Sequence, residues 1–134
     1  MANLTITAAN VKATATTVFK TGIAAAAITA GQSVYVDGTT GKIGLADADV
    51  AGANIAAGVA LCNAAQDQIV SYAVGGQVNM GATLVKGTTY VVSATAGAVA
   101  PQADLTTGAA IGILGVAADA TYLIVNPLNP GVTL

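Results

Sequence analysis

The segment QSVYVDGTTGKIGL, residues 32–45, contains two short runs of β-forming residues on either side of a Gly-rich turn. The run Val34–Val36 favours a strand, and Asp37-Gly38 is typical of tight hairpin turns. The same pattern continues along the chain, where runs of Val, Ile, Thr and Tyr alternate with Gly, Asp and Asn. The sequence therefore predicts an all-β protein with few or no long helices.

Strands are predicted at short intervals along the whole chain: 3–8, 11–19, 32–36, 42–45, 56–62, 67–74, 76–80, 82–85, 88–93, 97–100, 111–117 and 121–126. A length of 134 residues favours one domain, which we place at residues 21–126. Pro127 and Pro130 are incompatible with a regular helix or a central strand. Residues 127–134 are therefore expected to form a C-terminal extension, and residues 1–20 an N-terminal arm or edge strand.

Two segments of the chain have similar sequences. Residues 28–61 align with residues 84–117 at an offset of 56, which becomes 57 near the end. The alignment gives ten identities, where about four are expected from this composition. Matched Gly residues carry the most weight, because Gly marks backbone geometry rather than bulk. The prediction is two similar β units packed as one barrel or sandwich; the alternative is coincidence between two Ala- and Gly-rich segments.

Charged side chains are scarce. They make up 7% of the residues, where a soluble domain usually has about 25%. The chain has four Lys and six Asp, but no Arg, Glu or His. These absences exclude His-based triads, arginine clamps and His-rich metal sites. We therefore expect no catalytic residue, no cofactor and no metal, and a structural or binding role.

The hydrophobic core is expected to be thin. Hydrophobic residues make up 54% of the chain, but 31 of them are Ala, and the chain has one Phe and no Trp. Oligomerisation is the usual remedy for a small core, and we expect it here. The four Tyr residues fit equally well as core residues and as contact anchors: Tyr35, Tyr72, Tyr90 and Tyr122.

Neither nucleic acid nor a membrane is an expected partner. The four Lys residues are scattered and outnumbered by Asp, so the chain lacks the basic footprint of nucleic-acid binding. The longest uncharged apolar run, residues 22–31, is shorter than the ~20 residues of a membrane-spanning helix. The first ten residues lack the basic and apolar parts of a signal peptide, so we expect synthesis in a cytoplasm.

Two segments have a faint likeness to functional motifs. Asp47-Ala48-Asp49 begins like a calcium loop, but Gly58 stands where an EF-hand has its Glu. Solvated loop carboxylates explain this segment better. Cys62 has no His to activate it, and it is expected to act as a small hydrophobic residue in a strand.

The second half of the chain carries a resemblance to a known family. It lies in residues 83–97, TLVKGTTYVVSATAG, and continues through Val99-Ala100-Pro101, Ala103-Asp104-Leu105 and Leu114-Gly115-Val116-Ala117. Over about residues 28–126, the chain resembles the capsid decoration, or cement, proteins of tailed bacteriophages.

This resemblance implies a β-barrel or β-tulip subunit, commonly a homotrimer, that sits on the exterior of an icosahedral virion capsid. Its partner would be the major capsid protein, and its role would be to clamp neighbouring capsomers. Related β modules occur in phage head fibres and tail fibres. The alternative function is therefore a fibre or adhesin module that binds a host surface.

The N-terminal segment lies outside the repeat and alternates polar and apolar residues. We expect it to pair with a neighbouring subunit or with the capsid by strand addition. The residues predicted to make capsid or subunit contacts are Asn3, Leu4, Ile6, Lys12 and Phe19.

Overall fold

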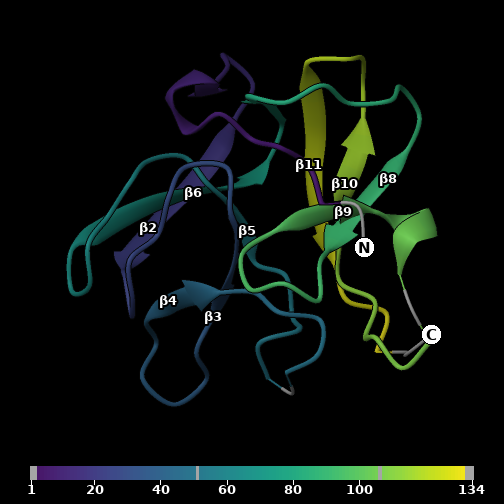
Figure 1. Cartoon of the computed structure of the whole chain (residues 1–134). Coiled ribbons are helices and arrows are strands. Elements are labelled where there is room, and N and C mark those ends of the chain that lie inside the picture. Colours follow the sequence, from purple (N-terminus) through teal and green to yellow (C-terminus); the bar gives the residue numbers. More distant parts are fainter. Residues whose placement is uncertain (1–2, 51, 106, 132–134) are drawn as a thin grey trace.

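The chain folds into two antiparallel β-sheets that lie against each other (Figure 1). The computed structural model describes residues 3–50, 52–105 and 107–131. The strand order is β1-β7-β11-β10-β8-β9 in the first sheet and β2-β6-β5-β3-β4 in the second. The all-β prediction is confirmed. Because each sheet is open and does not close on itself, the molecule is sandwich-like rather than a barrel.

The first sheet contains β1 (Val11–Ala13), β7 (Gln77–Met80), β8 (Thr89–Val92), β9 (Val99–Pro101), β10 (Ile113–Ala117) and β11 (Tyr122–Leu128). The second contains β2 (Val18–Ile23), β3 (Ser33–Val36), β4 (Ile43–Leu45), β5 (Gly58–Ala60) and β6 (Ile69–Gly75). Among the described residues, helical structure is limited to two 3-10 turns, η1 (Ala8–Asn10) and η2 (Gln102–Asp104). The prediction of few or no long helices is therefore confirmed.

Three of the predicted strands, at residues 3–8, 11–19 and 82–85, differ from the structure. Residues 3–8 form no ladder: the Leu4 N–H donates to Val99 O at 2.8 Å, and the Thr7 N–H to Gly81 O at 2.9 Å. The strand predicted at 11–19 is broken by a turn, and its two parts, β1 and β2, belong to different sheets. Residues 82–85 also form no strand. An alternating pattern reports which side chains face inward, but a ladder also needs a partner strand in register.

The C-terminal boundary was predicted too early. β11 continues to Leu128 and includes Pro127, so the extension expected from residue 127 begins two residues later. β7 flanks β11 only over residues 122–124. At Pro127, β11 therefore has a neighbouring strand on one side only, namely β10. Proline has no backbone N–H, and on the open side of β11 this N–H would have no strand to bond to. Residues 132–134 lie outside the described residues.

The two similar segments of the sequence form the same arrangement of strands. In the β3–β6 unit, β3 pairs with β4 and β5, and β5 pairs with β6. In the β8–β11 unit, β8 pairs with β9 and β10, and β10 pairs with β11. The registers also coincide, since Val34 lies opposite Leu45 and Tyr90 lies opposite Pro101, each 56 residues further on. The internal similarity of the sequence is thus matched by a repeat of strand pairing.

Matched glycines lie where the backbone of both units takes the same unusual conformation. Gly31 and Gly87 have φ angles of 91° and 81°, and Gly41 and Gly97 have 72° and 77°. Residues with a Cβ rarely adopt this left-handed region. The Gly matches in the sequence therefore correspond to equivalent turns.

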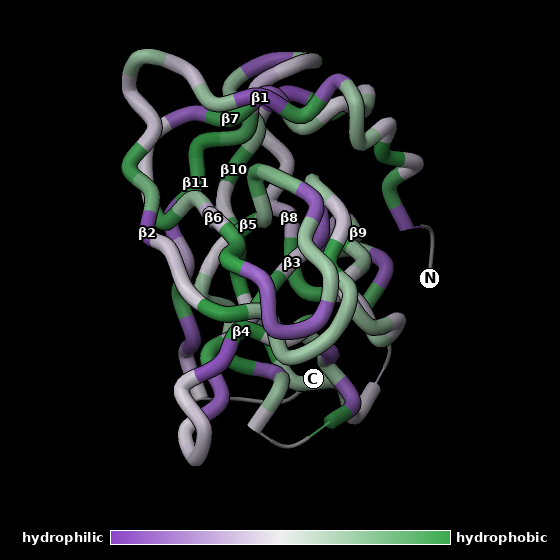
Figure 2. The backbone as a smooth tube through the Cα atoms, turned by 90° about the vertical axis from the view of Figure 1, so that its left-hand side faces the viewer, coloured by the Kyte–Doolittle hydropathy of each residue, from purple (hydrophilic) through white to green (hydrophobic). Residues whose placement is uncertain are grey.

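The main hydrophobic cluster joins the two sheets, and a second cluster lies within the second sheet. Valine supplies most of the largest fully buried side chains. Tyr90 and Tyr72 are core residues, whereas Tyr35 and Tyr122 are half-buried. The buried hydroxyl of Tyr90 accepts a hydrogen bond from the Val85 N–H at 2.9 Å. Figure 2 shows hydrophobic segments along the strands and hydrophilic segments mainly at the outer turns.

Candidate functional site

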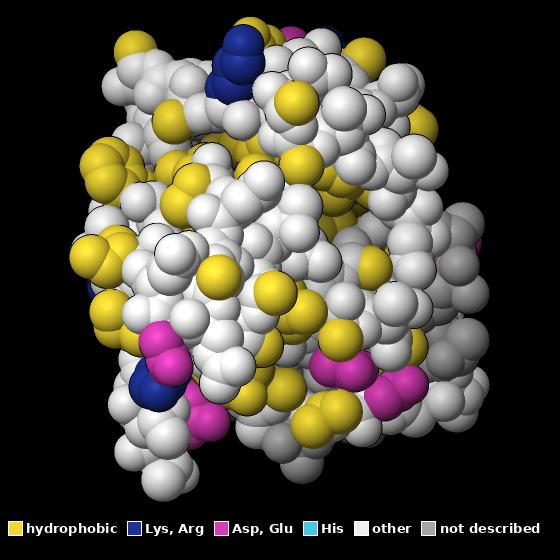
Figure 3. All heavy atoms as spheres, turned by 60° about the vertical axis from the view of Figure 1, so that its left-hand side comes forward, with side chains coloured by type: hydrophobic (Ala, Val, Ile, Leu, Met, Phe, Trp, Pro, Cys, Tyr) yellow, Lys and Arg dark blue, Asp and Glu magenta, His cyan; other side chains and the backbone are white. Residues whose placement is uncertain are grey.

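The surface is poor in charge. On the face shown in Figure 3, a few charged side chains and scattered apolar ones lie among polar groups. Within the described residues, one ion pair is formed, between Lys42 Nζ and Asp67 Oδ1 at 2.9 Å. Both side chains are exposed, so this pair contributes little to stability. Binding at this surface would therefore depend on shape, apolar contact and hydrogen bonds.

Several carboxylates shape turns. Asp37 Oδ1 accepts the N–H groups of Thr39 and Thr40 at 2.7 and 3.1 Å, and these bonds, Thr39 first, lower the pKa of Asp37 below its ordinary value of 3.8. The N–H groups of Thr121 and Tyr122 lower the pKa of Asp119 in the same way.

Asp47 and Cys62, which were considered for metal and thiol chemistry, also accept hydrogen bonds from backbone N–H groups of their own chain. Asp47 Oδ1 accepts the Asp49 N–H at 2.9 Å. The half-buried Cys62 Sγ accepts the Ser71 N–H at 3.4 Å. In the part of the chain that the structure describes, no three acidic, Cys or His side chains gather at a possible metal site.

Three predicted contact residues lie against their own chain. Asn3 Oδ1 accepts a hydrogen bond from Ser93 Oγ at 2.6 Å. Leu4 and Ile6 are half-buried and pack against the main hydrophobic cluster. The described part of residues 1–20 therefore does not form a free arm: β1 and β2 are edge strands, one in each sheet.

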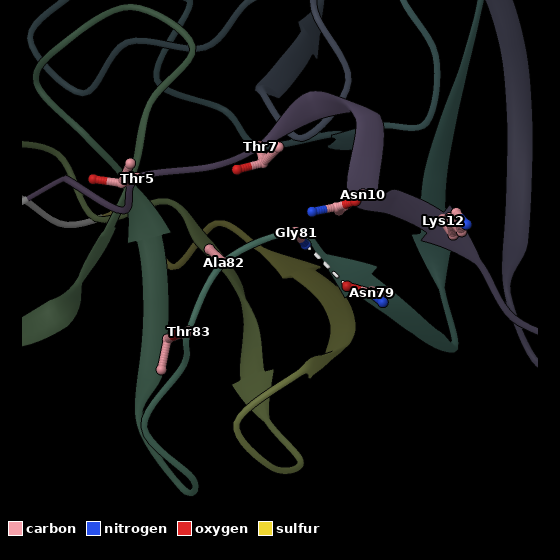
Figure 4. A pocket seen from close by; sticks show the side chains of 8 residues that line it. All are labelled: Thr5, Thr7, Asn10, Lys12, Asn79, Gly81, Ala82 and Thr83. Carbon is pink, nitrogen blue, oxygen red and sulfur yellow. Dashed lines mark hydrogen bonds between the residues drawn. The ribbon is translucent and has the colours of Figure 1, made fainter.

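Lys12 is exposed beside a polar hollow of about 460 Å³ (Figure 4). Asn79 Oδ1 accepts the Gly81 N–H at 3.0 Å on its wall. Sequence reasoning identified Lys12 but missed the rest of the hollow, because its lining comes from two segments about 70 residues apart in the chain. The lining residues are Thr5, Thr7, Asn10, Lys12, Asn79, Gly81, Ala82 and Thr83.

Phe19 belongs to a different surface. It lies on β2, which pairs with β6 alone in the second sheet as described, and its side chain is 57% exposed. Ile23 lies four residues further along the strand, on the same face, and pairs with Ile69, which is 68% exposed. Val18, at the start of the strand, is 57% exposed. We call these four residues the β2 edge.

The structure thus divides the predicted contact residues among three places. Asn3, Leu4 and Ile6 hold the N-terminal segment on the first sheet. Lys12 borders the polar hollow, and Phe19 lies on the β2 edge of the second sheet. The sequence offered one signal for the β2 edge, the single Phe of the chain.

No helix among the described residues is both long enough and apolar enough to cross a membrane. Comparison with known proteins gave no match, either to the models of protein families or to curated protein sequences.

Proposed function

We propose that this protein is a non-enzymatic structural protein of a phage virion, which binds the outer surface of the capsid and stabilises contacts between capsomers. The observation that carries the proposal is the β2 edge, a group of exposed apolar side chains at an edge strand that also exposes Lys20. The sequence resemblance to capsid decoration proteins over residues 28–126 supplies the partner, the major capsid protein.

The β2 edge suits binding by strand addition. An edge strand presents backbone N–H and C=O groups that a further strand can pair with, while alternate side chains determine specificity. Phe19, Ile23 and Ile69 would be the apolar anchors of such a contact. Each exposed apolar side chain that a partner covers adds about 25 cal/mol per Å² of buried area.

A capsid repeats the same contact many times. Modest contacts made by many copies, or by subunits of a homotrimer as the resemblance implies, add up through multivalency. The low charge of the chain fits this role, because few charged groups would have to be desolvated. Binding of this kind is expected to depend only weakly on salt concentration.

The polar hollow favours a second candidate, a fibre or adhesin module that binds a host-surface glycan. Its Thr hydroxyls, Asn amides and Lys12 are groups that can bond to sugar hydroxyls. However, no lining residue is aromatic, so a sugar ring would find no flat apolar surface there. We therefore place capsid binding first.

The test uses DNA-filled heads that lack this protein, purified from the phage that encodes it. Wild-type protein is expected to co-sediment with the heads and to raise the temperature at which they release DNA. Phe19→Ser should bind about tenfold more weakly, because it removes an apolar anchor. Val85→Ser is the matched control: Val85 is 66% exposed and lies outside the β2 edge, so this variant should bind like wild type.

Two results would count against the proposal. Wild-type protein that fails to bind the heads but binds tails or host cells would favour the adhesin function. Equal binding of wild type and Phe19→Ser to the heads would show that the β2 edge is not part of the contact.

A further inference from the structure

A groove lies beside β2, on the face of the strand opposite to Phe19. It has a volume of about 320 Å³, and residues of both sheets line it. Lys20 of β2 pairs directly with Tyr72 of β6, so the two side chains point to the same face. Phe19 pairs with Ala73 and points to the other face. We call this hollow the Lys20 groove: Lys20, Val36, Ala57, Tyr72, Val74 and Pro127.

Lys20 is the one charged residue that lines the groove. It is exposed, and the one ion pair within the described residues is formed elsewhere, by Lys42 and Asp67. The ammonium group of Lys20 therefore has no carboxylate partner in the described part of the chain. A carboxylate of another molecule can reach it without displacing an existing partner.

Tyr72 supplies a second polar group to the groove. The residue is 6% exposed, and among the described residues its hydroxyl forms no hydrogen bond. Every enclosed side-chain oxygen of the described residues has a partner, so this hydroxyl is open to the surface, where Tyr72 lines the groove. Buried tyrosine hydroxyls usually have a hydrogen-bond partner. We therefore expect the partner of this hydroxyl to come from outside the chain.

The two polar groups suit a carboxylate. An ammonium group and a phenolic hydroxyl both donate hydrogen bonds, and a carboxylate accepts several at once. The other lining residues are apolar, and Val36 among them is 46% exposed. Apolar walls favour a carboxylate that is attached to an aliphatic side-chain stem, as in Asp or Glu, over a free hydrated anion.

The position of the groove beside an edge strand indicates the form of the ligand. A strand that added to β2 would place alternate side chains on the two faces of the second sheet. On one face they would lie beside Phe19 and Ile23, and on the other beside Lys20. β2 would thus favour a segment in which an acidic residue stands between two apolar residues.

We propose that the Lys20 groove binds the carboxylate of an Asp or Glu side chain on an extended protein segment that pairs with β2. The inference rests on the proposed function for the source of this segment, the major capsid protein. Lysines on edge strands also commonly prevent unwanted strand pairing. The Tyr72 hydroxyl favours a binding role, and the two roles predict opposite effects when the charge of Lys20 is removed.

The first test measures binding to the same DNA-filled heads that lack this protein. Lys20→Met should bind about fivefold more weakly, which corresponds to one opposite-charge pair across two strands. Tyr72→Phe should bind about threefold more weakly, because it removes one hydrogen bond and keeps the ring in the core.

The matched controls are Lys86→Met and Tyr122→Phe. Lys86 is exposed and Tyr122 is half-buried, and neither residue lines the groove. Both variants should bind the heads like wild type, and thermal unfolding should show all four variants folded.

The second test does not need the capsid. The probes are the capped peptide Ser-Thr-Val-Glu-Val-Thr-Ser and the same peptide with Gln in place of Glu. In an NMR titration of the full chain, the Glu peptide should bind about fivefold more tightly than the Gln peptide and shift the signals of β2 and Tyr72. Lys20→Met should abolish this difference.

The inference is overturned if Lys20→Met binds the heads as tightly as wild type or more tightly, the result expected of a lysine that only prevents pairing. It is also overturned if the two peptides bind equally, or if neither shifts the β2 signals at about millimolar concentration. Weaker binding of Phe19→Ser to the heads would then leave the proposed function standing. Wild-type protein that binds no heads would overturn the proposed function, and the peptide titration would still decide whether the groove prefers a carboxylate.

Discussion

Gly58 lies in β5, directly against the backbone of β6. A Cβ at this position would lie 1.9 Å from Ala73 O, and a backbone oxygen held in a sheet cannot move aside as a side chain can. We expect Gly58→Ala to lower the free energy of unfolding by about 1–3 kcal/mol, as overpacked sites do. Urea denaturation measures this change.

The control for this prediction is Gly38→Ala. Gly38 has no heavy atom within 4 Å of where its Cβ would be, and it does not have a positive φ. Its replacement should leave stability nearly unchanged. Equal stability of Gly58→Ala and wild type would show that the β5–β6 contact adjusts to a Cβ.

At the scale of the element, the N-terminal segment stabilises its own sheet. Ile6 is half-buried against the main hydrophobic cluster. We expect Ile6→Ser to lower the free energy of unfolding by about 1–2 kcal/mol, because it removes apolar contact from the core. The exposed-site variant Val85→Ser should change it by less than about 0.5 kcal/mol.

The same pair of variants separates a structural role from a binding role. Below its unfolding temperature, Ile6→Ser should bind phage heads as wild type does. Weakened binding with unchanged stability would instead make Ile6 a contact residue of the capsid complex.

At the scale of the whole molecule, the two units share a core. The main hydrophobic cluster draws buried residues from both sheets, so neither unit completes its core alone. We therefore expect a single cooperative unfolding transition in urea, with coincident curves from far-UV circular dichroism and tyrosine fluorescence. Two separated transitions would show that the units are independently stable.

The candidate site was only partly predictable. Phe19, one of the predicted contact residues, is 57% exposed on an edge strand, and its contact with another molecule stays a prediction. Leu4 and Ile6, which the sequence predicted as contacts with another molecule, are half-buried and pack against the main hydrophobic cluster of their own chain. Alternation shows that one side of a segment is apolar, whereas the surface that receives that side is built by residues far away in the sequence.

The fold class, the turns and the repeat were determined by the sequence itself. Strand propensity and turn chemistry are local properties. A glycine such as Gly31 or Gly87 is required because the backbone at that residue has a positive φ angle. These features can therefore be predicted from the sequence without knowing which residues are in contact in the folded chain.

Only the tertiary structure decided which faces are covered. The tripeptide Gly-Val-Ala occurs at residues 58–60 and 115–117, in equivalent strands of the two units. Its valine is fully buried as Val59 and 40% exposed as Val116. The burial of a side chain depends on what packs against it, and here the other sheet covers one copy and leaves the other open.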